Sequence, residues 1–444
     1  MKKIVLSIFS FVLIASINAQ TTTNAPDSEY KFTKIAHLDA TPVQSQGNTG
    51  TCWSFSALSF FESELIRKGN KNPDVLSEMF IVRKAYESKA DKYIRMDGKT
   101  NFSQGGAFHD IPYVVKRYGI VPQEVYSGLI NGAKKYNHDE LFAVLEGIVK
   151  GVNNGSKPIS TSWKIAFNSI LDAYLGQDVK EFEWKGKKYT PQSYAQAIGL
   201  NMDDYISLTS FTNHEMNKPC MLEIQDNWAW GSSYNVSLED LNNAAIYALK
   251  NGYTLAWGSD VSERGFSFSN GLGIVPEDPE TIKVKGRDNS NFSDGGAERT
   301  SDAFKTPVKE LTITQELRQE GYDNKTTTDD HGMHIVGLYK DQNGTNYYLV
   351  KNSWGTGNYP QGYLYVSENF FKYKTINIYL HKRRFVERDE EKIKYSIILI
   401  RAILASLLLW LFFKNYFYEE NFTFNQFNFY WLFNICSNAK MRYS

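Results

Sequence analysis

A short run ahead of an apolar helix pattern constrains this chain more than any other stretch. It reads Gln46-Gly47-Asn48-Thr49-Gly50-Thr51-Cys52-Trp53-Ser54-Phe55, with a glutamine six positions before a cysteine. After the cysteine, apolar residues recur at helical spacing as far as a glycine that suits a C-terminal cap: Phe55, Leu58, Phe61, Leu65 and Gly69. The pattern predicts that Cys52 opens a buried helix, whose unpaired N–H groups and dipole favour a thiolate.

Two stretches far downstream supply the partners that a reactive cysteine needs. Asp330-His331-Gly332-Met333-His334 places a histidine at the start of an apolar strand pattern, and Lys351-Asn352-Ser353-Trp354-Gly355 places an asparagine at the end of another. A lone cysteine is most simply a small buried hydrophobic residue. Cysteine, histidine and asparagine in that order, with an upstream glutamine, instead match the residue set of a thiol protease.

On these residues the chain resembles the papain superfamily of cysteine proteases, and within it the bleomycin hydrolase and aminopeptidase C branch (peptidase C1-like). The resemblance is carried by Cys-Trp-Ser-Phe at Cys52, Asn-Ser-Trp-Gly at Asn352 and Asp-His-x-Met at His331. Further matching stretches are Leu76-Ser77-Glu78, Gly105-Gly106, Tyr118-Gly119-Ile120-Val121-Pro122 and Trp257-Gly258-Ser259-Asp260-Val261. The matching region runs from residue 30 to residue 382 and covers most of the chain.

The resemblance implies a role for each matching residue. Cys52 would attack the scissile carbonyl, His331 would hold the proton and return it, and Asn352 would orient the imidazole. Trp354 would cover the bond between histidine and asparagine beside the bound substrate. Gln46 and the backbone N–H of Cys52 would form the oxyanion hole. This set of residues needs no cofactor and no metal.

Two assignments within this set have alternatives. Gly105 and Gly106 resemble the glycine loop that lines the substrate cleft and lets a peptide approach the backbone closely, but a simple turn would also use them. His334 competes with His331, since residues three apart on a strand face opposite sides, and the resemblance selects His331. A metal site formed by Cys52 and both histidines is a further alternative, although that spacing suits a helix better than a strand.

The spacing of the motifs predicts an enlarged fold. Cys52 and His331 are 331 − 52 = 279 residues apart, whereas the papain signature expects about 130–150. The extra residues, about 127–250, follow mainly helical patterns. These are His138–Val152, Ser162–Leu175, Pro191–Leu200 and Ser237–Lys250, with a hairpin at Glu181–Tyr189. We expect an α+β papain-like fold, with a helical half, an antiparallel β-barrel half and a large, mainly helical insertion. By resemblance, such insertions build homo-oligomers, typically hexamers, and narrow access to the site.

The N-terminus predicts export. Lys2 and Lys3 precede an apolar run, and Ala19 offers a small residue before a cleavage point, so residues 1–19 are predicted to be a signal peptide. The mature protein would then be periplasmic or extracellular. Three cysteines cannot form a disulfide framework. The chain has 49 basic and 49 acidic residues, which gives no indication of a nucleic acid partner.

The peptidase domain is predicted to span residues 20–384, and the tail at 385–444 departs from it in character. Tyr395 to Phe413 is apolar and long enough to span a bilayer. After export, however, the basic residues before this run would lie outside, against the positive-inside bias. Three interpretations stay open: an aberrant tail from a shifted reading frame, a membrane anchor, or a packed helix.

The predicted activity is hydrolysis of peptide bonds through an acyl-enzyme thioester, with peptides as substrates. An aminopeptidase of the bleomycin hydrolase type is the first hypothesis. An exported papain-like endopeptidase is the alternative, because the tail stands where that branch keeps the C-terminal carboxylate that captures the substrate amine. An inactive peptide-binding homologue is the third hypothesis, and the presence of all four catalytic residue types argues against it.

Overall fold

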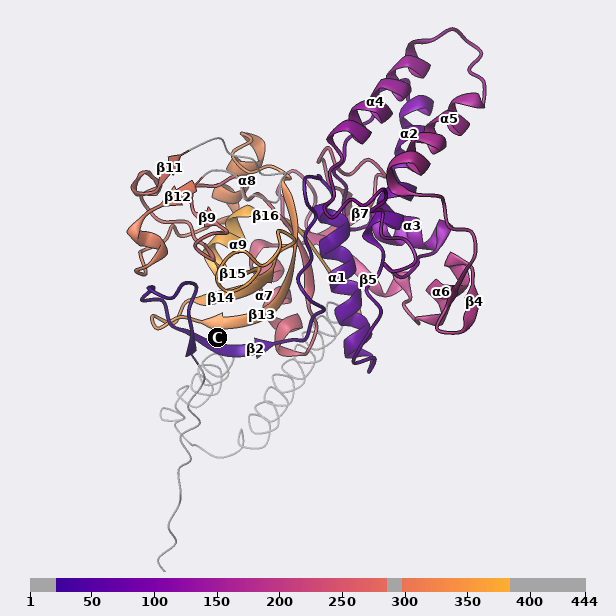
Figure 1. Ribbon diagram of the computed structural model, residues 1–444. Coiled ribbons are helices and arrows are strands. Elements are labelled where there is room, and N and C mark those ends of the chain that lie inside the picture. Colours follow the sequence, from indigo (N-terminus) through magenta and orange to yellow (C-terminus); the bar gives the residue numbers. More distant parts are fainter. Residues whose placement is uncertain (1–20, 286–297, 384–444) are drawn as a thin grey trace, which may run out of the picture. The chain divides into compact units, whose positions relative to one another are not determined.

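The computed structural model describes residues 21–285 and 298–383 of the chain. Figure 1 shows α1 between a group of helices, α2 to α6, and the sheet, with α7, α8 and α9 on the sheet side. The helices of this described part are α1 (Cys52–Arg67), α2 (Glu78–Arg95), α3 (Asp110–Tyr118), α4 (Asp139–Asn154), α5 (Ser162–Leu175), α6 (Pro191–Ala197), α7 (Leu238–Lys250), α8 (Gln315–Asp323) and α9 (Glu368–Lys374).

A single mixed sheet contains most of the strands. Its members are β1 (Thr21–Thr22), β2 (Phe32–His37), β5 (Tyr205–Thr209), β6 (Lys218–Met221), β7 (Ser232–Asn235), β8 (Leu255–Ser259), β9 (Phe266–Ser267), β10 (Leu272–Gly273), β13 (His331–Lys340), β14 (Asn346–Lys351), β15 (Tyr363–Ser367) and β16 (Thr375–His381). Two separate hairpins complete the described strands: β3 (Phe182–Trp184) with β4 (Lys187–Tyr189), and β11 (Lys283–Lys285) with β12 (Glu298–Thr300).

Strand β13 is the central strand of this sheet. The strand order is β6-β7-β5-β16-β8-β13-β14-β15-β10-β9, and β2 also pairs with β13. The first half of β13 pairs with β8, its second half with β2, and β14 runs antiparallel along it. The pairings of β5 with β7 and of β10 with β15 are parallel. Because β13 begins at His331 and β14 ends at Lys351, the pairing brings their ends together.

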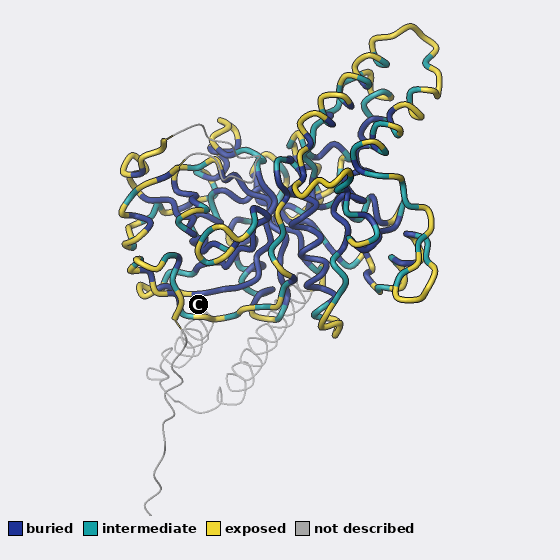
Figure 2. The backbone as a smooth tube through the Cα atoms, in the orientation of Figure 1, coloured by how far each residue is buried: buried dark blue, intermediate teal, exposed yellow. Residues whose placement is uncertain are grey.

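Helix α1 is buried on every side, as its apolar pattern predicts. Fourteen of its 16 residues are buried, including Trp53 and Phe60, and Figure 2 shows this burial along the helix. It packs against α2 and α3 on one side and against β8 and β13 on the other. A helix enclosed in this way holds its N-terminal residue in a fixed place, which is where Cys52 lies.

The predicted helices and hairpin between residues 127 and 250 are confirmed as α4, α5, α6, α7 and the β3–β4 pair. Helices α4 and α5 lie side by side and expose much of their length (Figure 2). Strands β5, β6 and β7 also fall in this region, and the sequence did not predict them. Their residues read YISLT, KPCM and SSYN, and the last two lack the apolar alternation that signals a strand. They extend the main sheet at one edge.

Several predictions concern residues that the structure does not describe. The signal peptide at residues 1–19 and the tail at 385–444 both lie outside the described ranges. Among the described helices, none combines the length and apolar character that a membrane span requires.

Candidate active site

Cys52 is the first residue of α1, as predicted. Its side chain is 8% exposed, and the backbone N–H of Gly332 donates to its Sγ at 3.4 Å. The structure therefore brings the cysteine against the start of β13, 280 residues later in the chain. Cys52 and His331 border the same small cavity.

His331 opens β13 and is bonded to the residue that follows β14. Its Nε2 lies 2.8 Å from Oδ1 of Asn352, an oxygen that also accepts the backbone N–H of Ser353 at 2.7 Å. Because that oxygen can only accept, we assign the ring hydrogen to Nε2. Nδ1 has no hydrogen-bond partner within the described residues. The ring is 2% exposed, and Cys52 borders the same cavity.

Trp354 lies against the imidazole of His331. Their ring centroids are 4.6 Å apart and the planes are 27° from parallel. The indole is 7% exposed, so it shields the histidine and its asparagine bond from water. It does not border the cavities beside Cys52. Its contact is therefore with the imidazole, whereas the resemblance also implied a place beside the substrate.

Burial disfavours the charged forms of both Cys52 and His331 when either is ionised alone. It raises the pKa of the Cys52 thiol to about 12 and lowers the pKa of the His331 imidazole to about 4. Desolvation at this enclosed site thus opposes the shift toward the thiolate that the helix N-terminus predicts. A proton moving from the thiol to the imidazole would create two opposite charges whose attraction offsets that burial.

Gln46 is held rigidly in the loop before α1. Its Nε2 donates to the carbonyl of Thr49 at 2.7 Å, and its Oε1 accepts from Ser353 Oγ at 2.6 Å. A side-chain amide has two hydrogens, so the bond to Thr49 leaves one for a substrate oxygen. These bonds tie the Cys52 loop to the segment that follows Asn352.

Gly105 and Gly106 line the cleft, and neither position has room for a side chain. A Cβ on Gly105 would fall 1.9 Å from Asp226 Oδ2, and one on Gly106 would fall 2.8 Å from Trp53 Cε2. Lys89 holds this loop in place, because its ammonium donates a hydrogen bond to the carbonyl of Gly105. Close approach of other groups explains these glycines; a simple turn would not require it.

His334 faces away from Cys52. It is fully buried and its Nδ1 lies 2.9 Å from Ser59 Oγ, a hydroxyl that also accepts from Lys351 Nζ at 2.7 Å. Burial and the nearby lysine lower the pKa of His334 well below its ordinary value. The two histidines point to different neighbours, as strand alternation predicts, so the alternative of a shared metal with Cys52 finds no support in their placement.

An acidic cleft of about 650 Å³ lies beside Cys52. Its charged lining consists of Glu146, Glu223, Asp226, Lys325, Asp329 and Asp330. Sequence reasoning identified none of these as site residues except Asp330, which it used only as part of a motif. The pair Asp329-Asp330 directly before His331 was the available signal. Nothing in the local sequence marks Asp226, which reaches the cleft from the segment between β6 and β7.

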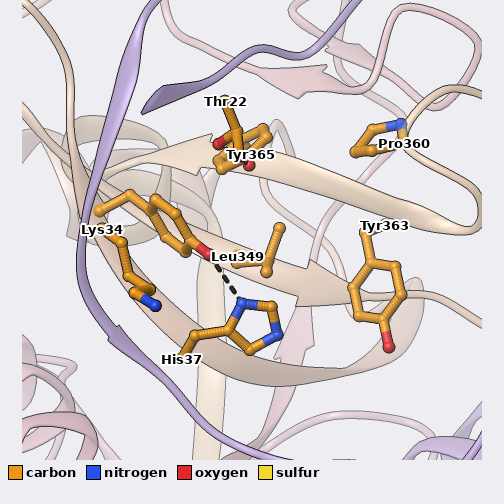
Figure 3. Close-up of a pocket in the computed structure, with 8 residues that line it drawn as sticks. Thr22, Lys34, His37, Leu349, Pro360, Tyr363 and Tyr365 are labelled. Atoms are coloured by element: carbon orange, nitrogen blue, oxygen red, sulfur yellow. Dashed lines mark hydrogen bonds between the residues drawn. The ribbon is translucent and has the colours of Figure 1, made fainter. Parts of the chain in front are cut away.

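A second cavity, of about 270 Å³, lies on the sheet (Figure 3). His37, Tyr339, Tyr363 and Tyr365 are among its lining residues, and His37 Nδ1 lies 2.7 Å from the hydroxyl of Tyr339. The imidazole is thus already bonded, and the lining contains neither a thiol nor a carboxylate. We therefore place the candidate active site at Cys52.

Comparisons with known proteins find papain-like peptidases and proteins named aminopeptidases. The profile of the papain family cysteine protease matches residues 29–140 and 305–380, and that of the peptidase C1-like family matches residues 172–275. The chain is 22% identical to aminopeptidase G of Lactobacillus delbrueckii subsp. lactis, over 80% of this chain and 84% of that protein. It is 21% identical to aminopeptidase C of Listeria monocytogenes, over 82% and 86%.

A solved structure shares the fold. The crystal structure of pepw from Lactobacillus rhamnosis covers 82% of this chain and 85% of its own, with a TM-score of 0.61 at 20% identity. The predicted papain-like α+β fold is confirmed.

Proposed function

Since this chain is a papain-like cysteine peptidase, similar to the aminopeptidase C branch, we propose that it removes N-terminal residues from peptides, with Cys52, His331 and Asn352 as its catalytic residues. The observation that carries the mechanism is the bond from His331 to Asn352 beside the cavity that His331 shares with Cys52. The exopeptidase assignment draws on relatives that are named aminopeptidases. It is also supported by Asp226, which covers Gly105 and restricts the cleft there.

Catalysis begins with proton transfer within the buried pair. His331 Nδ1 takes the thiol proton as Cys52 Sγ attacks the carbonyl carbon of the scissile bond. The remaining amide hydrogen of Gln46 and the Cys52 backbone N–H stabilise the resulting oxyanion. The bond from Nε2 to Asn352 keeps Nδ1 directed at the sulfur, and Trp354 prevents the ring from rotating away.

Two steps then complete the cycle. The C–N bond breaks, and the proton on Nδ1 passes to the leaving nitrogen, which departs as the shortened peptide. The acyl group remains on Cys52 as a thioester. Water attacks this thioester while His331 accepts a proton from the water. The proton then returns to the sulfur as the C–S bond breaks and the carboxylic acid leaves. The pair of Cys52 and His331 is neutral at both ends of the cycle.

Product analysis tests this proposal. The full chain is incubated with one decapeptide in two forms, with a free and with an acetylated N-terminus, and products are identified by mass spectrometry over time. The expected result is a ladder of single-residue losses from the free form and none from the acetylated form, with no products from Cys52→Ala. Internal fragments from both forms would instead establish the endopeptidase.

A further inference from the structure

Asp226 presents one carboxylate oxygen to the cleft. Its Oδ1 accepts hydrogen bonds from Asn101 Nδ2 at 3.2 Å and from Ser103 Oγ at 3.1 Å. Its Oδ2 lies directly over Gly105, and no donor in the described residues bonds to it. The side chain is thus fixed through one oxygen, while the other is left for a group that enters the cleft.

Asp329 also brings an uncommitted carboxylate to the cavities that Cys52 lines. The residues on either side of it are tied to another loop: the Thr328 N–H donates to Asp260 Oδ2 at 2.7 Å, and Asp330 Oδ2 accepts the Ser262 N–H at 3.0 Å. Asp329 borders both cavities that contain Cys52. Within the described ranges its carboxylate makes no hydrogen bond or ion pair.

The surroundings of these carboxylates favour a cation. Burial, and then the charge of Asp226, raise the pKa of Asp329 well above its ordinary value. Burial likewise raises the pKa of Asp226, although Lys89 opposes this shift. A positive charge placed between them would relieve their mutual repulsion.

The cavity that the two carboxylates line also contains Cys52 and His331, and this indicates which cation would bind there. His331 is 2% exposed with Nδ1 unpartnered, and it faces the cavity that Cys52, Asp226 and Asp329 also line. The group that occupies this cavity is therefore the part of the peptide at the scissile bond. In an unblocked peptide, the positive charge next to the first carbonyl is the α-ammonium group.

We propose that Asp226 and Asp329 bind the α-ammonium group of the substrate and so make the cleft selective for free N-termini. This inference rests on the aminopeptidase function proposed above. Two carboxylates that line the same cleft can each accept a charge-assisted hydrogen bond from the three hydrogens of an ammonium. An acetylated amine supplies neither the charge nor the hydrogens.

Binding of the ammonium would also assist the nucleophile. Burial is the main reason that the pKa of Cys52 is raised, and the negative charges of Asp226 and Asp329 add to it. A bound ammonium would cancel these charges and favour proton transfer from the thiol. Free-amine substrates would then gain in the chemical step as well as in binding.

The test compares Asp329→Asn, Asp226→Asn and the double variant with wild type and with Glu320→Gln, an exposed carboxylate on α8. Asparagine keeps the shape of each side chain, and at position 226 its oxygen can still accept from Asn101 and Ser103. The substrates are leucyl-aminomethylcoumarin with a free amine and an acetyl-arginyl analogue with a blocked one. Alkylation of Cys52 by neutral iodoacetamide reports on an intact site.

Each single variant should lower kcat/KM for the free-amine substrate by roughly 10- to 100-fold, which is the effect of losing a charged hydrogen bond. The double variant should lose more, and Glu320→Gln should match wild type. Alkylation should be as fast as in wild type or faster, because a negative charge near the thiol has been removed. Loss of hydrolysis without any loss of alkylation would not arise from general damage to the site.

Three outcomes would overturn the inference, and they are distinguishable. Unchanged selectivity in the double variant, with a wild type that prefers free amines, would refute the role of these carboxylates and leave the aminopeptidase intact. Selective loss of acetyl-arginyl hydrolysis would show that the carboxylates bind a basic side chain. A wild type that cleaves blocked substrates equally well would refute the aminopeptidase function as well.

Discussion

The two sides of the cleft are built in different ways. On the catalytic side, Cys52 opens α1, His331 opens β13 and Asn352 follows β14, so each side chain is positioned by a regular element of the core. On the opposite side, Asp226 lies between β6 and β7, in a segment without regular structure. The comparison teaches that helices and strands of the core position the catalytic residues. Side-chain hydrogen bonds between loops instead shape the cleft and determine which substrates can enter it.

The loop that carries Asp226 is fastened at several points. Trp228 Nε1 donates to the buried Asp110 at 2.5 Å, and Tyr322 donates its hydroxyl hydrogen to the carbonyl of Glu223 at 2.8 Å. Asn227 Nδ2 donates to the carbonyls of Leu222 and Gly231, each at 3.0 Å, and closes the loop on itself. If the comparison holds, changes on the catalytic side should abolish turnover, while changes in this loop should alter selectivity.

The largest effect is expected from Cys52→Ala. Without the sulfur there is no acyl-enzyme, so kcat should fall by roughly 10⁴-fold or more. The fold should persist, since alanine fits at the start of a buried helix. Steady-state hydrolysis and circular dichroism measure the two quantities. Turnover near the wild-type level would eliminate the proposed nucleophile.

The two histidines of β13 provide a matched pair for the next prediction. His331→Ala should reduce kcat nearly as far as loss of Cys52, because the two residues act as one unit. His334→Ala should keep most of kcat while unfolding more easily, by about 2–4 kcal/mol, since it leaves a cavity near Ser59. Hydrolysis rates and urea denaturation separate these effects. If His334→Ala proved to be the inactive variant, the assignment of the catalytic histidine would be reversed.

A smaller effect is expected from loosening the loop that carries Asp226. Trp228→Phe removes the indole donor and leaves an oxygen of Asp110 short of one partner, at a cost of about 1–3 kcal/mol in stability. The ratio of kcat/KM for free and acetylated substrates should fall several-fold, with acylation of Cys52 retained. Trp230→Phe is the control, because Trp230 is 51% exposed. Equal loss for both substrates would mean that the loop supports the chemistry itself.

The smallest effect on activity is expected at Glu310, on the sheet side of the molecule. This carboxyl accepts from Ser367 Oγ and the Val275 N–H, and burial raises its pKa from 4.5 to about 7. Between these two values the folded state holds a proton that the unfolded state has lost, so stability falls as pH rises through that window.

Glu310→Gln should remove the part of the pH dependence of stability that comes from this carboxyl. The difference in unfolding free energy between pH 4 and pH 8 should shrink by up to ~3 kcal/mol, and kcat/KM should stay unchanged. Urea denaturation across the pH range measures it. Glu277→Gln, at an exposed position nearby, should keep the wild-type profile. A profile for Glu310→Gln that equals wild type would show that this carboxyl does not titrate differently on folding.

The contrast between the two sides also explains how far sequence reasoning reached. Cys52, His331 and Asn352 stand at the boundaries of periodic patterns, so their elements could be predicted, and the resemblance to papain-like proteases implied that the three residues meet. Helices α4 to α7 could be predicted from their capping residues and the helical spacing of their apolar residues. Strands β6 and β7 did not, because their short polar sequences become strands only by joining an existing sheet.

Asp226 and Asp329 were missed for a related reason. Their importance depends on which loops face one another across the cleft, and that follows from the pairing of distant strands. The raised pKa of Cys52 could not be foreseen either, since a helix N-terminus suggests the opposite shift until the extent of burial is known.

The central claim is that Cys52 accepts one N-terminal residue at a time. The most direct test is to mix the full chain with a free-amine peptide, quench with acid within the first turnovers and measure the mass of the intact protein and of the fragment that contains Cys52. We predict added mass equal to one N-terminal residue on that fragment. Added mass equal to a longer acyl segment, or to an acyl group on a different residue, would contradict the account.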